Sequence, residues 1–172
     1  QFALHKLGDA LSQSGTSFAS DDDPDLIKDA APFSLKLMES LLAETPRHTG
    51  LLLAAASGFT QYAYAFVQQE ADELEARDLA AAGALRARAK RLYVRARDYG
   101  LRGLDLNHPG FEKSLRENPR RALASAKKDD VPFLYWTAAA WASAVALSKD
   151  NPDFVADLPL AEALIDSALE LD

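Results

Sequence analysis

The sequence contains no cysteine. This absence excludes disulfide bonds, thiol nucleophiles, thiolate metal sites and iron–sulfur clusters. Positive charge is also scarce, since 19 Lys and Arg stand against 26 Asp and Glu and give a formal net charge of −7. A chain of this charge has little attraction for the phosphates of nucleic acid or for anionic lipid, so we expect no nucleic-acid partner.

No stretch alternates apolar and polar residues in the way a half-buried β-strand does. Alanine and leucine instead dominate between eight prolines, and the chain is 48% hydrophobic. Several prolines follow a residue that can cap a helix, as at Asp23-Pro24, Asn118-Pro119 and Asn151-Pro152. Proline suits the first helical turn because its φ angle is fixed and it has no N–H to leave unpaired. The sequence therefore predicts an all-α protein.

These start signals divide the chain into expected helices over residues 3–13, 24–44, 47–75, 80–106, 109–117, 119–127, 131–149, 152–157 and 159–171. Pro32 is expected to kink or break the second helix. Residues 14–22 are polar and contain glycine, so we expect a loop there. Because no other stretch has the composition of a linker, we expect a single domain over residues 1–172.

Three helix endings are similar and almost evenly spaced: LLAETP at 41–46, GLDLNHP at 103–109 and ALELD at 168–172. The pattern resembles the second helix of a tetratricopeptide repeat, in which small residues let two antiparallel helices approach closely. The spacing is nearly twice the repeat length of about 34 residues. We therefore expect helical hairpins with degenerate tetratricopeptide-like repeats and inserted helices, with 51–69 and 133–148 as first helices.

Two of the expected helices lack charged residues, over 49–69 and 131–148. A membrane-spanning helix needs about 20 predominantly apolar residues. The first stretch carries Ser57, Thr60 and Gln61, and the second is short and begins beside a proline. We therefore interpret both as central helices of the fold, with other helices packed around them.

Large aromatic rings lie beside small alanines in both charge-free helices. The rings can pack closely against neighbouring helices, or they can border a cleft that the alanines leave unfilled. The sequence leaves both interpretations open. If a cleft forms, the candidate ligand-binding residues are Phe59, Tyr62, Tyr64, Tyr135, Trp136 and Trp141.

The stretch between residues 86 and 102 is rich in arginine. Acidic residues between 70 and 78 can offset this charge across a helical hairpin. We expect a solvated charged face that can also meet an acidic partner. The candidate partner-docking residues are Arg86, Arg88 and Arg95.

Motifs for catalysis or metal binding are missing from the sequence. The acidic run 21–25 lacks the glycine and glutamate that an EF-hand loop requires at its sixth and twelfth positions. The 3 histidines are far apart, and no glycine-rich phosphate loop occurs. We therefore expect no catalytic residue, no metal and no cofactor.

Three longer stretches, residues 18–46, 51–75 and 129–172, carry a family resemblance. Their most specific segments are GFTQYAYAFV at 58–67 and LYWTAAAW at 134–141. The sequence resembles the T component of tetratricopeptide-associated TRAP transporters, which are ATP-independent periplasmic uptake systems. The resemblance implies a periplasmic, usually lipid-anchored protein that can form a homotrimer, pairs with the solute-binding component and offers a cleft or pore to hydrophobic ligands. The lipidated cysteine expected near the N-terminus of the natural protein is not among these residues.

Our leading hypothesis is a non-enzymatic periplasmic accessory protein of a TRAP-type uptake system. It would dock the solute-binding protein and hold or pass a hydrophobic or organic-acid solute. The alternative is a generic tetratricopeptide adaptor that binds a peptide or protein partner in the cell envelope. A third hypothesis, a hydrolase or regulator, requires polar residues that converge only in space.

Overall fold

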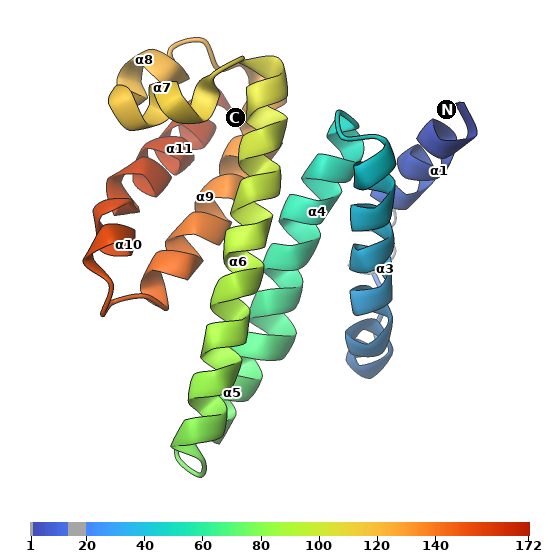
Figure 1. Ribbon diagram of the computed structural model, residues 1–172, viewed down its shortest axis with the longest axis vertical. Coiled ribbons are helices and arrows are strands. Elements are labelled where there is room, and N and C mark those ends of the chain that lie inside the picture. The colour runs from blue at the N-terminus through green and yellow to red at the C-terminus, as the bar shows by residue number, and fades with distance from the viewer. Residues whose placement is uncertain (1, 14–19) are drawn as a thin grey trace.

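The computed structural model describes residues 2–13 and 20–172, which form helices and turns without any β-strand (Figure 1). This confirms the expected all-α class. The α-helices are α1 (Phe2–Ser12), α3 (Pro24–Glu44), α4 (Thr49–Tyr62), α5 (Gln69–Leu74), α6 (Leu79–Asn107), α7 (Phe111–Glu117), α8 (Pro119–Leu123), α9 (Val131–Ala146), α10 (Pro152–Ala156) and α11 (Leu158–Leu171). A π-helical segment, η1 (Ala63–Gln68), joins α4 to α5, and a 3₁₀ turn, η2 (Lys128–Asp130), precedes α9.

The predicted caps before proline are confirmed at three helix starts. The Asp23 carboxylate accepts hydrogen bonds from the first backbone N–H groups of α3, and the Asn118 and Asn151 side chains do the same for α8 and α10. These contacts satisfy N–H groups that have no partner inside the helix. Helix positions that depend on such local chemistry could therefore be predicted from the sequence.

The expected bounds 24–44 of helix α3 are confirmed. Of the kink or break expected at Pro32, the break does not occur, because packing of α3 against α4 offsets one missing backbone hydrogen bond. The expected bounds of two short helices are wrong. Helix α7 begins after Pro109, because Gly110 has a positive φ of 79° that interrupts the helix before Phe111. Helix α8 ends at Leu123, well before residue 127. The predicted loop at 14–22 lies largely outside the described residues.

The long helix α6 is the centre of the packing, with α4 on one side and α9 on the other (Figure 1). Helix α9 also packs against α11. The approach of α6 to α9 is close, since a Cβ atom added to Gly103 would lie 2.0 Å from Cε1 of Phe133. These are the expected hairpins with small residues at their contacts. The tetratricopeptide-like repeat itself stays a prediction, because helix pairing alone does not distinguish it from other antiparallel bundles.

One helical stretch, Thr49–Leu74, is long and apolar enough to cross a membrane by length and composition. In the fold, however, this stretch contacts α3, α6 and α9, and Leu51, Leu52 and Ala55 are fully buried. The core helix of a folded domain meets the same criteria as a spanning helix. The burial agrees with our interpretation of a central helix.

Candidate functional site

An apolar cavity of about 190 Å³ lies between α3 and the helical stretch formed by α4 and η1. The two helices diverge from the turn that connects them (Figure 1). Small side chains at Ala54, Gly58 and Ala65 leave the space between them unfilled. The remaining lining consists of Ser12, Ile27, Ala31, Ser34, Leu35, Met38, Ser57, Gln61, Tyr62 and Phe66. The cavity can therefore take an apolar group.

The polar side chains of α4 that reach this cavity are bonded within their own helix. The Ser57 hydroxyl donates to the carbonyl of Ala54, and the Gln61 amide donates to the carbonyl of Ser57. Further along, Gln68 accepts a hydrogen bond of 2.7 Å from the Tyr93 hydroxyl. Their hydrogen-bonding capacity is thus partly used, and apolar contact remains the main interaction the cavity offers.

The six candidate ligand-binding residues do not converge on one cavity. Tyr62 lines the cavity between α3 and α4, whereas Phe59 and Trp141 are buried in the core. Tyr64 and Tyr135 are exposed, at 57% and 46%. Trp136 is half-buried, and its ring meets Tyr135 edge-on at 5.0 Å between centroids. A ligand-binding role for all six residues, Tyr62 included, stays a prediction.

The lining residues Leu35, Met38 and Phe66 were not among the predicted site residues. Helix α3 carries apolar side chains on two faces, with Leu35 and Met38 buried and Leu26 and Phe33 exposed. The helical spacing of an apolar stripe shows that it packs against something, but it does not show which helix lies opposite. The apolar stripe of α3 was therefore visible in the sequence, but it did not indicate that a cavity lies against it.

Of the three candidate docking residues, Arg86 is engaged within the protein. Its guanidinium lies 2.9 Å from carboxylate oxygens of both Asp72 and Glu75, across the turn between α5 and α6. The hydrogen bonds that Arg86 donates to these carboxylates raise the pKa of Arg86, and Arg86 in turn lowers the pKa of Glu75. The offset of basic by acidic residues expected from the sequence is present at this position.

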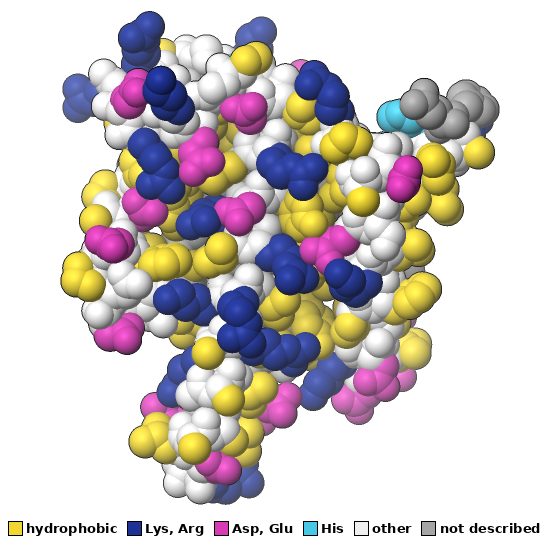
Figure 2. Space-filling model, viewed as in Figure 1, with side chains coloured by type: hydrophobic (Ala, Val, Ile, Leu, Met, Phe, Trp, Pro, Cys, Tyr) yellow, Lys and Arg dark blue, Asp and Glu magenta, His cyan; other side chains and the backbone are white. Residues whose placement is uncertain are grey.

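Arg88 and Arg95 instead belong to a row of arginines on one face of α6, together with Arg91 and Arg102. We call these four residues the arginine ridge. Three of them lie over aromatic rings: Arg88 is 5.8 Å from the centroid of Tyr62, Arg95 is 5.4 Å from Phe59 and Arg102 is 5.3 Å from Tyr99. Figure 2 shows Lys and Arg side chains gathered along this part of α6, facing α3.

One carboxylate, Glu39 of α3, lies beside the arginine ridge. It accepts a hydrogen bond of 2.9 Å from the Tyr99 hydroxyl and lies 3.4 Å from Arg95. Burial would raise the pKa of Glu39, but bonds from Lys36 and Tyr99 and the charge of Arg95 hold it below its ordinary value. Among the described residues, the remaining ridge arginines have no ion-pair partner. The ridge is therefore a positive surface on a negatively charged protein.

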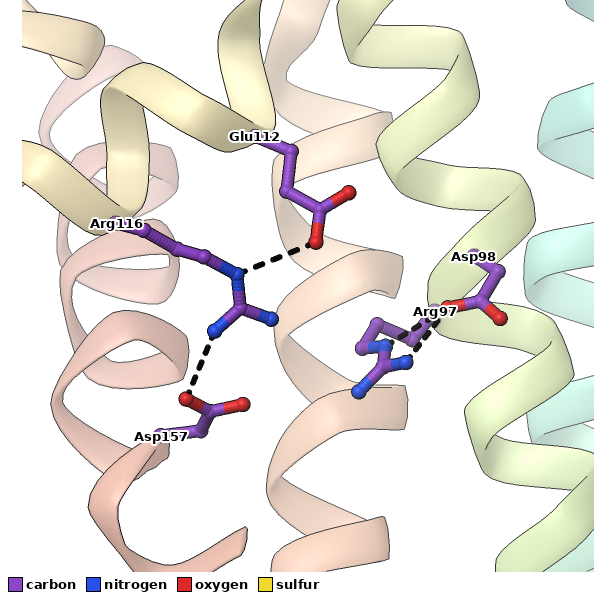
Figure 3. A network of polar contacts seen from close by, with 5 residues as sticks. All are labelled: Arg97, Asp98, Glu112, Arg116 and Asp157. Atoms are coloured by element: carbon purple, nitrogen blue, oxygen red, sulfur yellow. Dashed lines mark hydrogen bonds and ion pairs between the residues drawn. The ribbon is translucent and has the colours of Figure 1, made fainter. Parts of the chain in front are cut away.

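A second charged network, formed by Arg97, Asp98, Glu112, Arg116 and Asp157, lies on the other side of α6 (Figure 3). Arg97 and Arg116 lie 5.2 Å and 5.3 Å from the centroid of the Trp141 ring. Arg97 donates to Asp98, and Arg116 donates to Glu112 and Asp157. Because these bonds join α7 to the turn before α11, the network ties the last helices together over the indole. Its geometry fits a structural role.

The family model described as TRAP transporter T-component matches residues 20–172. The chain belongs to this family. It is also 32% identical over 154 residues to an uncharacterized protein of Treponema pallidum (strain Nichols), with 87% of this chain and 45% of that protein covered. The chain thus spans about half the length of this curated relative.

Family membership confirms the resemblance deduced from residues 18–46, 51–75 and 129–172. This T-component is an accessory component of a TRAP transporter. Components of this kind are generally non-enzymatic, and the family implies a membrane-associated or periplasmic location.

Proposed function

We propose that this protein, as a single helical domain, docks the solute-binding protein of its TRAP transporter through the arginine ridge. The partner surface would be acidic. We further propose that the cavity between α3 and α4 holds a hydrophobic or organic-acid solute, and that a lipid anchor keeps the full-length protein at a membrane in the periplasm. The observation that carries the proposal is the arginine ridge stacked on aromatic rings.

The ridge supports docking because its guanidinium groups are positioned by neighbouring side chains and, apart from Arg95, have no ion-pair partner in the described part of the chain. Rings beneath Arg88, Arg95 and Arg102 restrict these long side chains before a partner arrives. Less conformational entropy is then lost when they pair with carboxylates of a partner. Opposite charges on two protein surfaces also accelerate encounter and fix their orientation.

The cavity and the ridge share one side chain. The Tyr62 ring lines the cavity and lies beneath the guanidinium of Arg88, which makes only a 3.5 Å contact with the Tyr62 hydroxyl. An organic acid with an apolar body could place that body in the cavity and its carboxylate near Arg88. A partner docked on the ridge would then lie next to the solute.

A homotrimer is also part of the proposal. Phe33 and Leu26 are seven residues apart on α3, so they share one face, and they are exposed at 73% and 56%. Exposed apolar side chains grouped in this way are typical of protein–protein contacts. Native mass spectrometry tests this directly: we expect trimers for the wild-type protein and monomers for Phe33→Asp. A wild-type monomer at micromolar concentration would contradict the trimer.

The docking proposal is tested by charge reversal. We expect Arg91→Glu combined with Arg95→Glu to weaken binding to the solute-binding protein encoded with the same transporter by at least about tenfold in Kd, because two attractions become repulsions. The matched control is Arg120→Glu, an exposed arginine on α8 far from α3. Isothermal titration calorimetry at 50 mM NaCl measures both. Equal losses for the ridge variant and the control would refute docking through the ridge.

A further inference from the structure

A polar cluster lies where α6, α8 and α9 meet, away from the ridge and from the cavity between α3 and α4. His108 ends α6, Ser125 follows α8 and Asp130 precedes α9. Nε2 of His108 is 2.8 Å from a carboxylate oxygen of Asp130, and Nδ1 is 3.3 Å from the hydroxyl of Ser125. A hydroxyl, an imidazole and a carboxylate thus form a chain of polar contacts.

Asp130 has an environment that keeps it ionised and fixed in place. Its residue is 3% exposed, and it accepts hydrogen bonds from the Asn107 amide at 2.8 Å and from the Lys127 backbone N–H at 2.9 Å. Burial would raise the pKa of Asp130, but the bonds from His108, Lys127 and Asn107 hold it below its ordinary value. In the imidazole tautomer that carries its proton on Nε2, toward the carboxylate of Asp130, the lone pair of Nδ1 faces Ser125.

The hydroxyl of Ser125 opens onto a pocket of about 280 Å³. Pro109, Phe111 and Ala122 give this pocket an apolar side. Arg121 lines it as well, and within the described part of the chain its guanidinium has no ion-pair partner. The pocket therefore offers an apolar surface and a positive charge beside a hydroxyl that faces a base.

We propose that Ser125 is the nucleophile of a second, hydrolytic site that acts on a small carboxylic ester. His108 serves as the base and Asp130 as the group that orients it. This inference goes beyond docking and solute holding, and it departs from the expectation of a non-enzymatic protein. Ser125, His108 and Asp130 are polar residues that converge only in space, as the hydrolase hypothesis requires.

The reaction follows from the positions of these atoms. Oγ of Ser125 attacks the ester carbonyl carbon while its proton moves to Nδ1 of His108, and Asp130 stabilises the resulting imidazolium through Nε2. Arg121 offers positive charge to the oxyanion. The carbon–oxygen bond to the alcohol then breaks, and the alcohol leaves with the proton from His108. Water, activated by His108, cleaves the acyl-serine, which releases the acid and restores the Ser125 hydroxyl.

The separation of 3.3 Å between Ser125 and His108 is longer than an ideal hydrogen bond. The Ser125 hydroxyl lies equally far, at 3.3 Å, from the carbonyl of Ala122. Catalytic hydrogen bonds in ligand-free enzymes are commonly long and shorten when substrate binds. We therefore expect the separation between Ser125 and His108 to shorten when an ester binds.

The first test uses a fluorophosphonate probe, which modifies activated serines. We expect intact-mass and peptide spectra of the wild-type protein to show one adduct on Ser125. Ser125→Ala should lose the adduct, whereas Ser114→Ala, a change in the same pocket lining, should keep it. No adduct on Ser125, or the same adduct in Ser125→Ala, would overturn the proposal.

The second test exploits the absence of cysteine, which makes any introduced thiol unique. We expect iodoacetamide to alkylate Ser125→Cys at pH 7 about tenfold faster than Ser40→Cys, because an adjacent imidazole increases the thiolate fraction. Ser40 is an exposed serine on α3 and serves as the matched control. Rates within twofold of each other would overturn the proposal, and thermal melts verify that both variants fold.

Discussion

The close contact between α6 and α9 at Gly103 predicts that Gly103→Ala is destabilising. The new Cβ atom would lie 2.0 Å, 2.4 Å and 2.6 Å from ring carbons of Phe133, which is itself buried between α6 and α9. Overpacking a core of this kind costs about 1–3 kcal/mol, occasionally more. Replacing a helical glycine by alanine returns about 1 kcal/mol through helix propensity. Since the ring cannot move without displacing α9, we expect the upper end of the packing cost, about 3 kcal/mol, and therefore a net loss of about 2 kcal/mol.

Gly83→Ala is the matched control, because Gly83 lies in the same helix and its added Cβ would meet no atom within 4 Å. Helix propensity then acts alone, so we expect this variant to gain about 0.5–1 kcal/mol. Urea denaturation followed by circular dichroism gives the free energy of unfolding of both variants. The loss in Gly103→Ala corresponds to a Tm lower by about 4–8 °C for a chain of this size. A Gly103→Ala protein as stable as the wild type would refute the close packing of α6 on α9.

Three further predictions concern polar side chains. Thr137→Val should leave the free energy of unfolding unchanged or raise it by about 1 kcal/mol in the same urea titration, because the buried Thr137 hydroxyl has no hydrogen-bond partner among residues 2–13 and 20–172. Arg86→Ala should lower the urea midpoint only slightly, and 0.5 M NaCl should remove the difference, since its pairs with Asp72 and Glu75 are exposed. Asp130→Asn should make the free energy of unfolding fall less steeply as the pH decreases. The folded-state pKa of Asp130 lies below its ordinary value of 3.8. The stability that the ionised carboxylate contributes is therefore fully present above pH 3.8 and is lost as the pH falls through the folded-state pKa. Urea midpoints between pH 2 and 6 measure that difference, and parallel curves would contradict it.

Helix starts and the overall class could be predicted because they depend on neighbouring residues. Asp23, Asn118 and Asn151 cap helices wherever those helices lie in the fold, and all three do so. The start of α7 was misplaced because the conformation of Gly110, two residues beyond His108, decided it. A single positive φ angle outweighed the proline signal at Pro109.

The candidate site could be predicted only in part, because it depends on which helices face each other. Of the candidate ligand-binding residues, Tyr62 lines the cavity, whereas Trp141 is fully buried beside Arg97 and Arg116. A ligand-binding role for either residue stays a prediction. Acidic residues in 70–78 were expected to offset the charge of the arginines. In the structure two of them form ion pairs with Arg86, whereas Arg88 has no ion pair among the described residues. Such pairings require the three-dimensional arrangement.

Site-specific crosslinking tests the central claim, docking through the arginine ridge, most directly. A single cysteine at Arg91→Cys can carry a benzophenone, since the chain has no other thiol, and Arg120→Cys provides the same probe on α8. Each labelled protein is irradiated with the solute-binding protein of its transporter. We expect a crosslinked heterodimer from position 91 and none from position 120. Crosslinks from position 120 alone, or equal yields from both positions, would contradict docking through the ridge.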